Sequence, residues 1–248
     1  MRKIATLVVA AVSVPLIGVG IAGAVSVDQT IKGSTSPTKK GTKKKPRAVK
    51  LKIDIATKKK IASEEFATKS ATIYFDRNLV FNTKYFKTCK ASTVQSNEGK
   101  CPKASKVGSG SAQGEALGQV QKLKVSAFNG PKNTLNLHVT GSSPLAIDSV
   151  IVGKLRNSSG SYGKKLVVTL PDNLQQPLPG VYATLTSFIT TISKKTARKS
   201  NNRRSKNYKV KVPYVGLRGC TKKKLKYKGV FVFTDGTKVT ATDTSKCR

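Results

Sequence analysis

The sequence predicts an all-β protein, and two observations support this. Most apolar segments alternate between apolar and polar residues with a period of two, which is typical of strands with one buried face. Turn-forming residues separate these segments every eight to fifteen positions, and helical periodicity is almost absent. About nine strands in this arrangement favour a two-sheet β-sandwich with Greek-key or jelly-roll connections; a barrel is the alternative.

The N-terminus predicts export. Arg2 and Lys3 precede an uncharged stretch, Ile4–Ala24, that ends in the A-x-A pattern Ala22-Gly23-Ala24. This combination is typical of a secretory signal, so we expect cleavage after residue 24 and a secreted or cell-envelope protein. The alternative is an uncleaved segment that anchors the protein in the membrane, because the stretch is almost long enough to span a bilayer.

Residues 25–47 predict a disordered, Lys-rich linker. The segment has no apolar period, and its second half is dominated by lysine, so it offers little apolar surface to offset the entropy lost on ordering. We interpret it as a solvated spacer that also provides an electrostatic arm for an anionic surface.

We expect a single domain over residues 48–248. Its first strand is Ala48–Ala56, where Val49, Leu51 and alternate residues after them are apolar, and its second is Ala71–Phe75. A break over residues 83–114 contains two cysteines and a short helix near Ala91–Asn97.

The remaining strands follow at nearly regular spacing. They are predicted at 117–128, 135–139, 147–155, 165–170, 181–192, 208–217, 226–234 and 237–242. In the strand at 181–192, both the odd-numbered and the even-numbered positions are mostly apolar or Thr, which predicts a central strand buried on both faces. Asp235-Gly236 predicts a type I′ hairpin turn between the last two strands. A basic loop at 194–206 interrupts the pattern.

The charge predicts anionic partners. Lys and Arg number 47 against 11 Asp and Glu, which gives a formal charge of +36, or about +34 after signal cleavage. Such a field attracts anionic polymers or an acidic membrane surface without fine specificity; nucleic acid is possible but less favoured. The predicted polyanion-binding residues are those of the two basic segments: Lys39, Lys40, Lys43, Lys44, Lys45, Arg47, Lys194, Lys195, Arg198, Lys199, Arg203, Arg204 and Lys206.

The four cysteines predict two disulfides. Proximity favours Cys89–Cys101 and Cys220–Cys247, and each loop would contribute about 3–4 kcal/mol in the chain-entropy model. Zinc is the weaker alternative because neither pair has close ligand spacing and the single histidine, His138, lies far from all four.

No motif predicts catalytic, cofactor or metal residues. The eleven acids are scattered, no G-x-S-x-G elbow occurs, and His138 lies at an outward strand position, where a surface histidine is expected. We therefore expect a non-enzymatic protein whose basic surface associates with anionic envelope polymers. One alternative is a glycan- or protein-binding module that exposes Tyr74 or Tyr227. The other is a hydrolase in which two acids, or an acid and His138, converge in a cleft.

The segment Cys101–Gly110 (CPKASKVGSG) resembles a C-P-x-x-S-x-x-G-x-G motif of uncharacterised exported β-rich proteins of actinobacterial type. Cys89, Asp235-Gly236 and Cys247 match the same layout. The resemblance implies a bacterial envelope setting and no known activity. Physically, the motif reads as a disulfide-closed loop whose glycines turn the chain into the next strand.

Overall fold

The computed structural model describes residues 26–201 and 208–248, so the predicted signal segment lies outside the described residues. Eleven antiparallel strands form one large sheet in the order β1-β3-β11-β6-β7-β8-β9-β10-β4-β15-β16. Their bounds are β1 Val27–Ser36, β3 Lys50–Lys59, β4 Thr68–Asp76, β6 Lys106–Ala116, β7 Gln119–Asn129, β8 Thr134–Gly141, β9 Ile147–Asn157, β10 Tyr162–Thr169, β11 Thr184–Ile192, β15 Lys224–Phe233 and β16 Lys238–Lys246.

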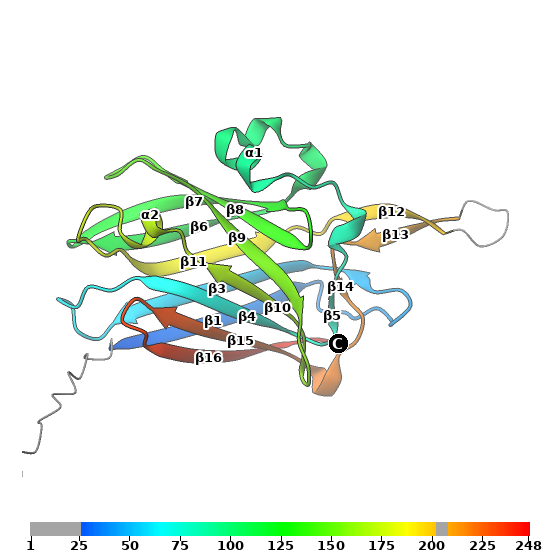
Figure 1. Cartoon of the computed structure of the whole chain (residues 1–248). Coiled ribbons are helices and arrows are strands. Elements are labelled where there is room, and N and C mark those ends of the chain that lie inside the picture. Colours follow the sequence, from blue (N-terminus) through cyan, green and yellow to red (C-terminus); the bar gives the residue numbers. More distant parts are fainter. Residues whose placement is uncertain (1–25, 202–207) are drawn as a thin grey trace, which may run out of the picture.

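The sheet curls into a nearly closed barrel (Figure 1). Its edge strands meet, since the Gly33 amide of β1 donates a hydrogen bond to Asp243 Oδ2 of β16 at 2.8 Å. The all-β prediction is confirmed, but the two-sheet sandwich of about nine strands is wrong. Alternation shows that each strand has one buried face, and that face is equally satisfied by a second sheet or by the far wall of a barrel.

The predicted linker contains the first strand of the barrel. Val27–Ser36 pairs antiparallel with β3 along its whole length and buries Ile31, Gly33 and Thr35. Of these inward residues only Ile31 is large and apolar, so the strand has little hydrophobic signal of its own. Backbone hydrogen bonds also fix the residues that follow, as Arg248 N donates to Thr38 O and Gly41 N donates to Leu217 O, both at 2.9 Å.

The predicted break over residues 83–114 is ordered differently in its two halves. The expected helix is present as α1, Ala91–Ser96, but the second half is strand β6, which contains both glycines of the motif. A Cβ at Gly110 would overlap the carbonyl oxygen of Ile189 on β11, and one at Gly108 would overlap that of Thr191. The glycines therefore permit close approach of two strands, where we had predicted a turn.

A second, three-stranded sheet lies at one end of the barrel, which we call the closed end. It consists of β2 Arg47–Ala48, β14 Val215–Leu217 and β5 Leu79–Phe81, in the order β2-β14-β5. The predicted basic loop starts as a strand, because β12 Thr196–Asn201 pairs with β13 Tyr208–Pro213 in a hairpin that projects from this end (Figure 1). Residues 202–207 lie outside the described residues.

Both predicted disulfides are present. Cys89 and Cys101 are bonded with a Cα–Cα distance of 5.5 Å, and Cys220 and Cys247 with 5.8 Å. The first closes the loop that carries α1, and the second ties the C-terminal segment to the start of β15.

The turn between β15 and β16 is not type I′. Gly236 has a positive φ of 90°, but Asp235 does not. Instead, the Asp235 carboxylate accepts a hydrogen bond from the Thr237 amide at 2.9 Å. The predicted burial of 181–192 on both faces is also wrong: β11 is central, between β3 and β6, but much of it is only half-buried.

The helical elements are short. Besides α1 they are α2 Asp172–Gln175, η1 Thr83–Tyr85, η2 Glu98–Lys100, η3 Lys103–Ser105 and η4 Thr221–Lys223. Within residues 26–201 and 208–248, no helix has the length and apolar character needed to cross a bilayer.

Candidate functional site

The inward faces of the strands enclose an apolar cavity of about 320 Å³. Six strands each contribute a large apolar side chain to its wall: Ile53, Ile73, Leu123, Leu137, Ile151 and Phe188. An eight-stranded barrel is just wide enough for its side chains to fill, and diameter grows with strand number. Eleven strands therefore leave space unless the inward side chains are unusually large.

Several large buried rings gather on the β15 side of this barrel. Tyr227 of β15 is fully buried against Gly33 of β1, and Phe66 packs edge-to-face on Phe233 with ring centroids 5.1 Å apart. On the β6 side, the wall is lined by Ala112 and Gly114. The cavity exists because small residues face inward there.

The cavity reaches the surface at the end opposite the three-stranded sheet, which we call the mouth. Leu117 and Leu178 line the cavity, yet they are 63% and 44% exposed. Ile61 and Val120, also exposed, lie at this same end, just after β3 and just inside β7. Leu117 and Leu178 thus form an apolar rim at the mouth, and Ile61 and Val120 add exposed apolar surface at the same end.

The other end of the cavity is blocked by aromatic rings from the closed end. Phe81 of β5 and Tyr214, just before β14, both line it. Tyr214 is held in place by edge-to-face packing on Phe86, with centroids 5.0 Å apart, and its hydroxyl donates to Asn129 Oδ1 at 3.1 Å. A ligand would therefore enter at the mouth and stop at these rings.

Few polar groups line the cavity. At the mouth, Glu115 lines it and forms an ion pair with Lys59 at 3.0 Å. Deeper along β11, Thr190 also lines the cavity; it is 7% exposed, and its Oγ1 has no hydrogen-bond partner among the described residues. Buried hydroxyls are nearly always satisfied, and this one is placed to hydrogen-bond with a polar group inside the cavity.

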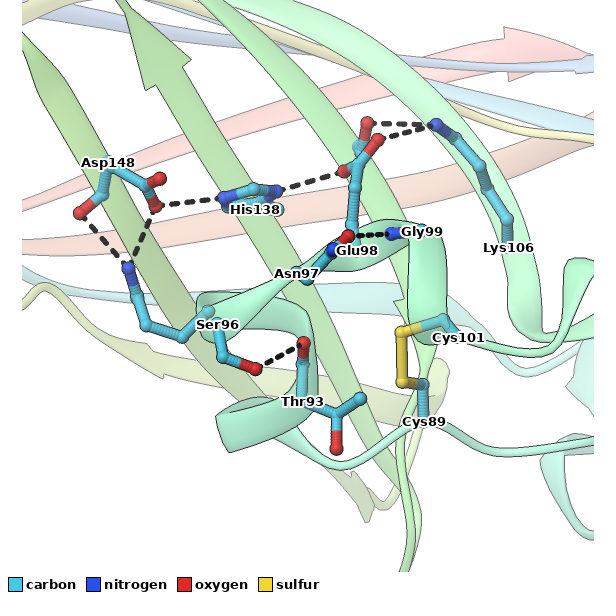
Figure 2. A network of polar contacts seen from close by, with 12 residues as sticks. Cys89, Thr93, Ser96, Asn97, Glu98, Gly99, Cys101, Lys106, His138 and Asp148 are labelled. Atoms are coloured by element: carbon cyan, nitrogen blue, oxygen red, sulfur yellow. Dashed lines mark hydrogen bonds and ion pairs between the residues drawn. A yellow bond between two sulfur atoms is a disulfide. The ribbon is translucent and has the colours of Figure 1, made fainter.

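A polar network lies outside the barrel, between β8, β9 and the α1 loop (Figure 2). His138 points outward from β8, with its Nδ1 2.9 Å from Glu98 Oε2 and its Nε2 2.9 Å from Asp148 Oδ1. Lys106 Nζ contacts Glu98 at 3.3 Å and donates to Ser126 Oγ at 3.0 Å. The disulfide-closed loop covers this part of the wall, so His138 is only 8% exposed; the predicted surface position is wrong.

The two carboxylates favour the protonated form of His138. Burial disfavours the imidazolium, but hydrogen bonds and charges from Glu98 and Asp148 outweigh it and raise the pKa of His138 above its ordinary value of 6.5. Burial also acts to raise the pKa of Glu98, but His138 and Lys106 together lower it. Both ring nitrogens of His138 are already within hydrogen-bonding distance of a carboxylate, so neither is free to face a substrate.

An acid and His138 thus do converge, as the hydrolase alternative requires, but on the outer wall and away from the cavity. The network fastens the α1 loop: Glu98 of η2 and Gln95 of α1 are both tied to the wall, with Gln95 Nε2 donating to Asp148 Oδ1 at 2.8 Å. Over the described ranges, no cluster of three or more His, Cys, Asp or Glu is placed to bind a metal ion.

The predicted polyanion-binding residues fall into two groups. Lys39, Lys40, Lys43, Lys44, Lys45 and Arg47 are all exposed at the closed end. In the second group, Lys194 is exposed and the Lys195 Nζ donates to the Lys106 carbonyl. Arg198 and Lys199 lie on β12, and nothing is described of their side chains; Arg203, Arg204 and Lys206 lie outside the described residues.

The two tyrosines considered for glycan stacking differ. Tyr227 has no exposed surface, so it is excluded as a platform. Tyr74 is half-buried on the outer wall, with its ring 5.5 Å from that of Tyr162 and the Lys228 Nζ 4.2 Å from its centroid.

Comparisons of this chain with protein-family models, with curated proteins and with solved structures gave no match in any of the three. The likeness to exported actinobacterial proteins therefore remains a prediction.

Sequence reasoning missed the cavity and its polar group. Thr190 lies in a segment of alternating Thr and apolar residues, where nothing distinguishes a core threonine from a ligand-facing one. The only available signal was that inward positions of β6 are small, at Gly110, Ala112 and Gly114, but β6 itself was not predicted.

Proposed function

We propose that this protein is a non-enzymatic binding protein that holds an apolar small molecule inside its barrel. The observation that carries the proposal is the cavity: about 320 Å³, walled by apolar side chains and reaching the surface at the mouth. Small-molecule sites are typically concave, mostly apolar and about 300–1,000 Å³ in volume, with a few polar groups that fix orientation.

The size of the cavity limits the ligand. Water occupies about 30 Å³ per molecule in the liquid, and a methylene group is of similar size, so the cavity takes roughly ten such groups. The unpartnered Thr190 hydroxyl favours a ligand with one hydrogen-bonding group on an otherwise apolar body. The apolar rim at the mouth lowers the cost of passing such a ligand from an apolar environment into the barrel.

We place this function outside the cytoplasm. Two disulfides are typical of an oxidising, extracytoplasmic environment, because cytosolic thiols are kept reduced. The predicted signal segment supports the finer proposal of a secreted or envelope protein.

Binding of the neutral fluorophore N-phenyl-1-naphthylamine tests the proposal, since a neutral probe avoids attraction to the basic surface. We expect saturable 1:1 binding that 1-decanol displaces. The variant Gly114→Leu should abolish or strongly weaken binding, because Gly114 lines the cavity and a Cβ there meets only the Thr184 carbonyl oxygen, at 3.8 Å. The added side chain thus fills the cavity without a backbone clash.

Gln113→Leu is the matched control. Gln113 is the preceding residue on the same strand and is exposed on the outer wall, so the same side chain is added outside the barrel. Equal loss of binding in both variants, or wild-type binding in Gly114→Leu, refutes the cavity as the binding site. Thermal unfolding of each variant verifies that it is folded.

A further inference from the structure

The two ends of the barrel differ sharply in charge. Segments at the closed end (36–50, 76–87, 129–134, 157–164, 192–201, 208–224 and 246–248) hold twenty-four Lys and Arg and a single acid, Asp76. Segments at the mouth (26–30, 57–70, 113–121, 140–148, 169–185 and 233–239) hold five Lys and Arg and seven acids. The positive charge of the chain is therefore concentrated at the end away from the ligand entrance.

Tertiary contacts gather eleven of these cations into one group, which we call the basic platform. Its members are exposed side chains from three segments: Lys39, Lys40, Lys43, Lys44, Lys45, Arg47, Lys222, Lys223, Lys224, Lys246 and Arg248. Backbone hydrogen bonds join the segments, with Arg248 N donating to Thr38 O and Cys247 N to Lys223 O, and the Cys220–Cys247 disulfide locks the second contact.

The basic platform lowers the stability of the folded protein when nothing is bound to it. Lys224 and Lys246 lie directly opposite each other in the β15–β16 ladder, where like charges are destabilising. Lys222 and Lys223 both have left-handed backbone, with φ of 53° and 56°, which non-glycine residues adopt at an energetic cost. The segments 38–47, 220–224 and 246–248 contain no acid that could neutralise this charge.

We propose that the basic platform docks the protein on a hydrated, phosphate-rich linear polymer and leaves the mouth facing away from it. Charge complementarity carries the inference. A bilayer fits less well, because the exposed large apolar side chains of the described residues are Ile61, Leu117, Val120, Val152 and Leu178, and none of them is in the platform. A nucleic acid fits less well because the segments 38–47, 222–224 and 246–248 contain no aromatic residue on which bases could stack.

The docking is independent of the proposed ligand binding, and its test uses linear inorganic polyphosphate of defined length. Binding is measured by fluorescence anisotropy across a salt series. Two triple variants remove charge from opposite sides of the platform: Lys43→Gln/Lys44→Gln/Lys45→Gln, and the same change at Lys222, Lys223 and Lys224. A third, at Lys122, Lys124 and Lys154, removes the same charge from exposed positions on the outer wall.

Log affinity falls linearly as log salt rises. In each platform triple this fall should be less steep by about 2, at roughly 0.7 per lost phosphate contact. Between 50 and 200 mM salt, the loss of affinity should then be about fifteenfold smaller than in the wild type. The wall triple should keep the wild-type slope.

Equal effects of all three triples would show that only net charge matters and would overturn the proposal. Tighter binding to phosphatidylglycerol vesicles than to polyphosphate, at equal phosphate concentration, would also overturn it, in favour of a membrane. N-phenyl-1-naphthylamine binding, measured on the same variants, should be unchanged, so a failure of docking is distinguishable from a failure of the cavity site.

Discussion

The affinity for straight-chain alcohols should depend on chain length up to a limit that the cavity sets. Each methylene buried in an apolar site contributes about 0.8 kcal/mol, and 1.4 kcal/mol is a tenfold change in affinity, so each added carbon should tighten binding about fourfold. The cavity of about 320 Å³ takes roughly ten methylene-sized groups at about 30 Å³ each, so affinity should level off near 1-decanol. Displacement of N-phenyl-1-naphthylamine by the 1-alkanols from six to sixteen carbons measures this.

The variant Gly114→Leu tests whether the limit belongs to this cavity; because it should bind N-phenyl-1-naphthylamine weakly or not at all, each alcohol is titrated into it directly by calorimetry. The leucine side chain places four carbon atoms inside the barrel, so the plateau should move from about ten carbons to about six. Gln113→Leu should leave it near ten. A series without a plateau, or a plateau that does not move in Gly114→Leu, would falsify the assignment, because the alcohols would then be binding elsewhere.

Three further variants test the polar group, the histidine network and the close strand contact. Thr190→Val should weaken 1-decanol binding about fivefold, because one hydrogen bond contributes about 1 kcal/mol to the binding free energy. Binding of decane should be unchanged, and an equal change for both ligands contradicts the assignment. The melting temperature of the wild type should exceed that of His138→Gln below pH 6.5, and the difference should shrink as pH rises through the raised pKa of His138, because the folded state holds the proton more tightly than the unfolded state. A difference that stays constant from pH 6 to 9 refutes the network with Glu98. Gly110→Ala should lower the free energy of unfolding, measured in urea, by about 1–3 kcal/mol, and Gly114→Ala should lower it by less. Equal decreases would contradict the close approach of β6 and β11.

Much of the local structure follows from the sequence. The alternation of Leu123, Val125 and Ala127 predicted a strand with those residues inside, and all three face the interior of the barrel. The disulfide pairing follows from chain proximity, since short loops cost the least entropy to close. The short helix at α1 was also correctly placed.

Two strands of the barrel escaped prediction for one physical reason. β1 buries Ile31, Gly33 and Thr35, and β6 buries Ala112 and Gly114, so neither has the run of large apolar residues that reveals a strand. Gly114 faces the open cavity, but at Gly33 a small residue is required because the Tyr227 ring already occupies the space. That requirement depends on partners far away in the sequence.

The candidate sites depend on the same distant contacts. The composition indicated a basic protein, but the basic platform exists only because residues 38–47, 222–224 and 246–248 meet at the closed end. The three residues of the histidine network are separated by 40 and 10 positions, and nothing local links them.

The sequence by itself determined that the chain is a β-rich, basic protein with two disulfides, because alternation, charge and cysteine spacing are local properties. Only the tertiary structure decided that the sheet curls into a barrel, that a cavity remains inside and that the charge gathers at one end. Closure of eleven strands sets the interior width independently of any one strand, and the volume left open is the difference between that width and the side chains that happen to face it.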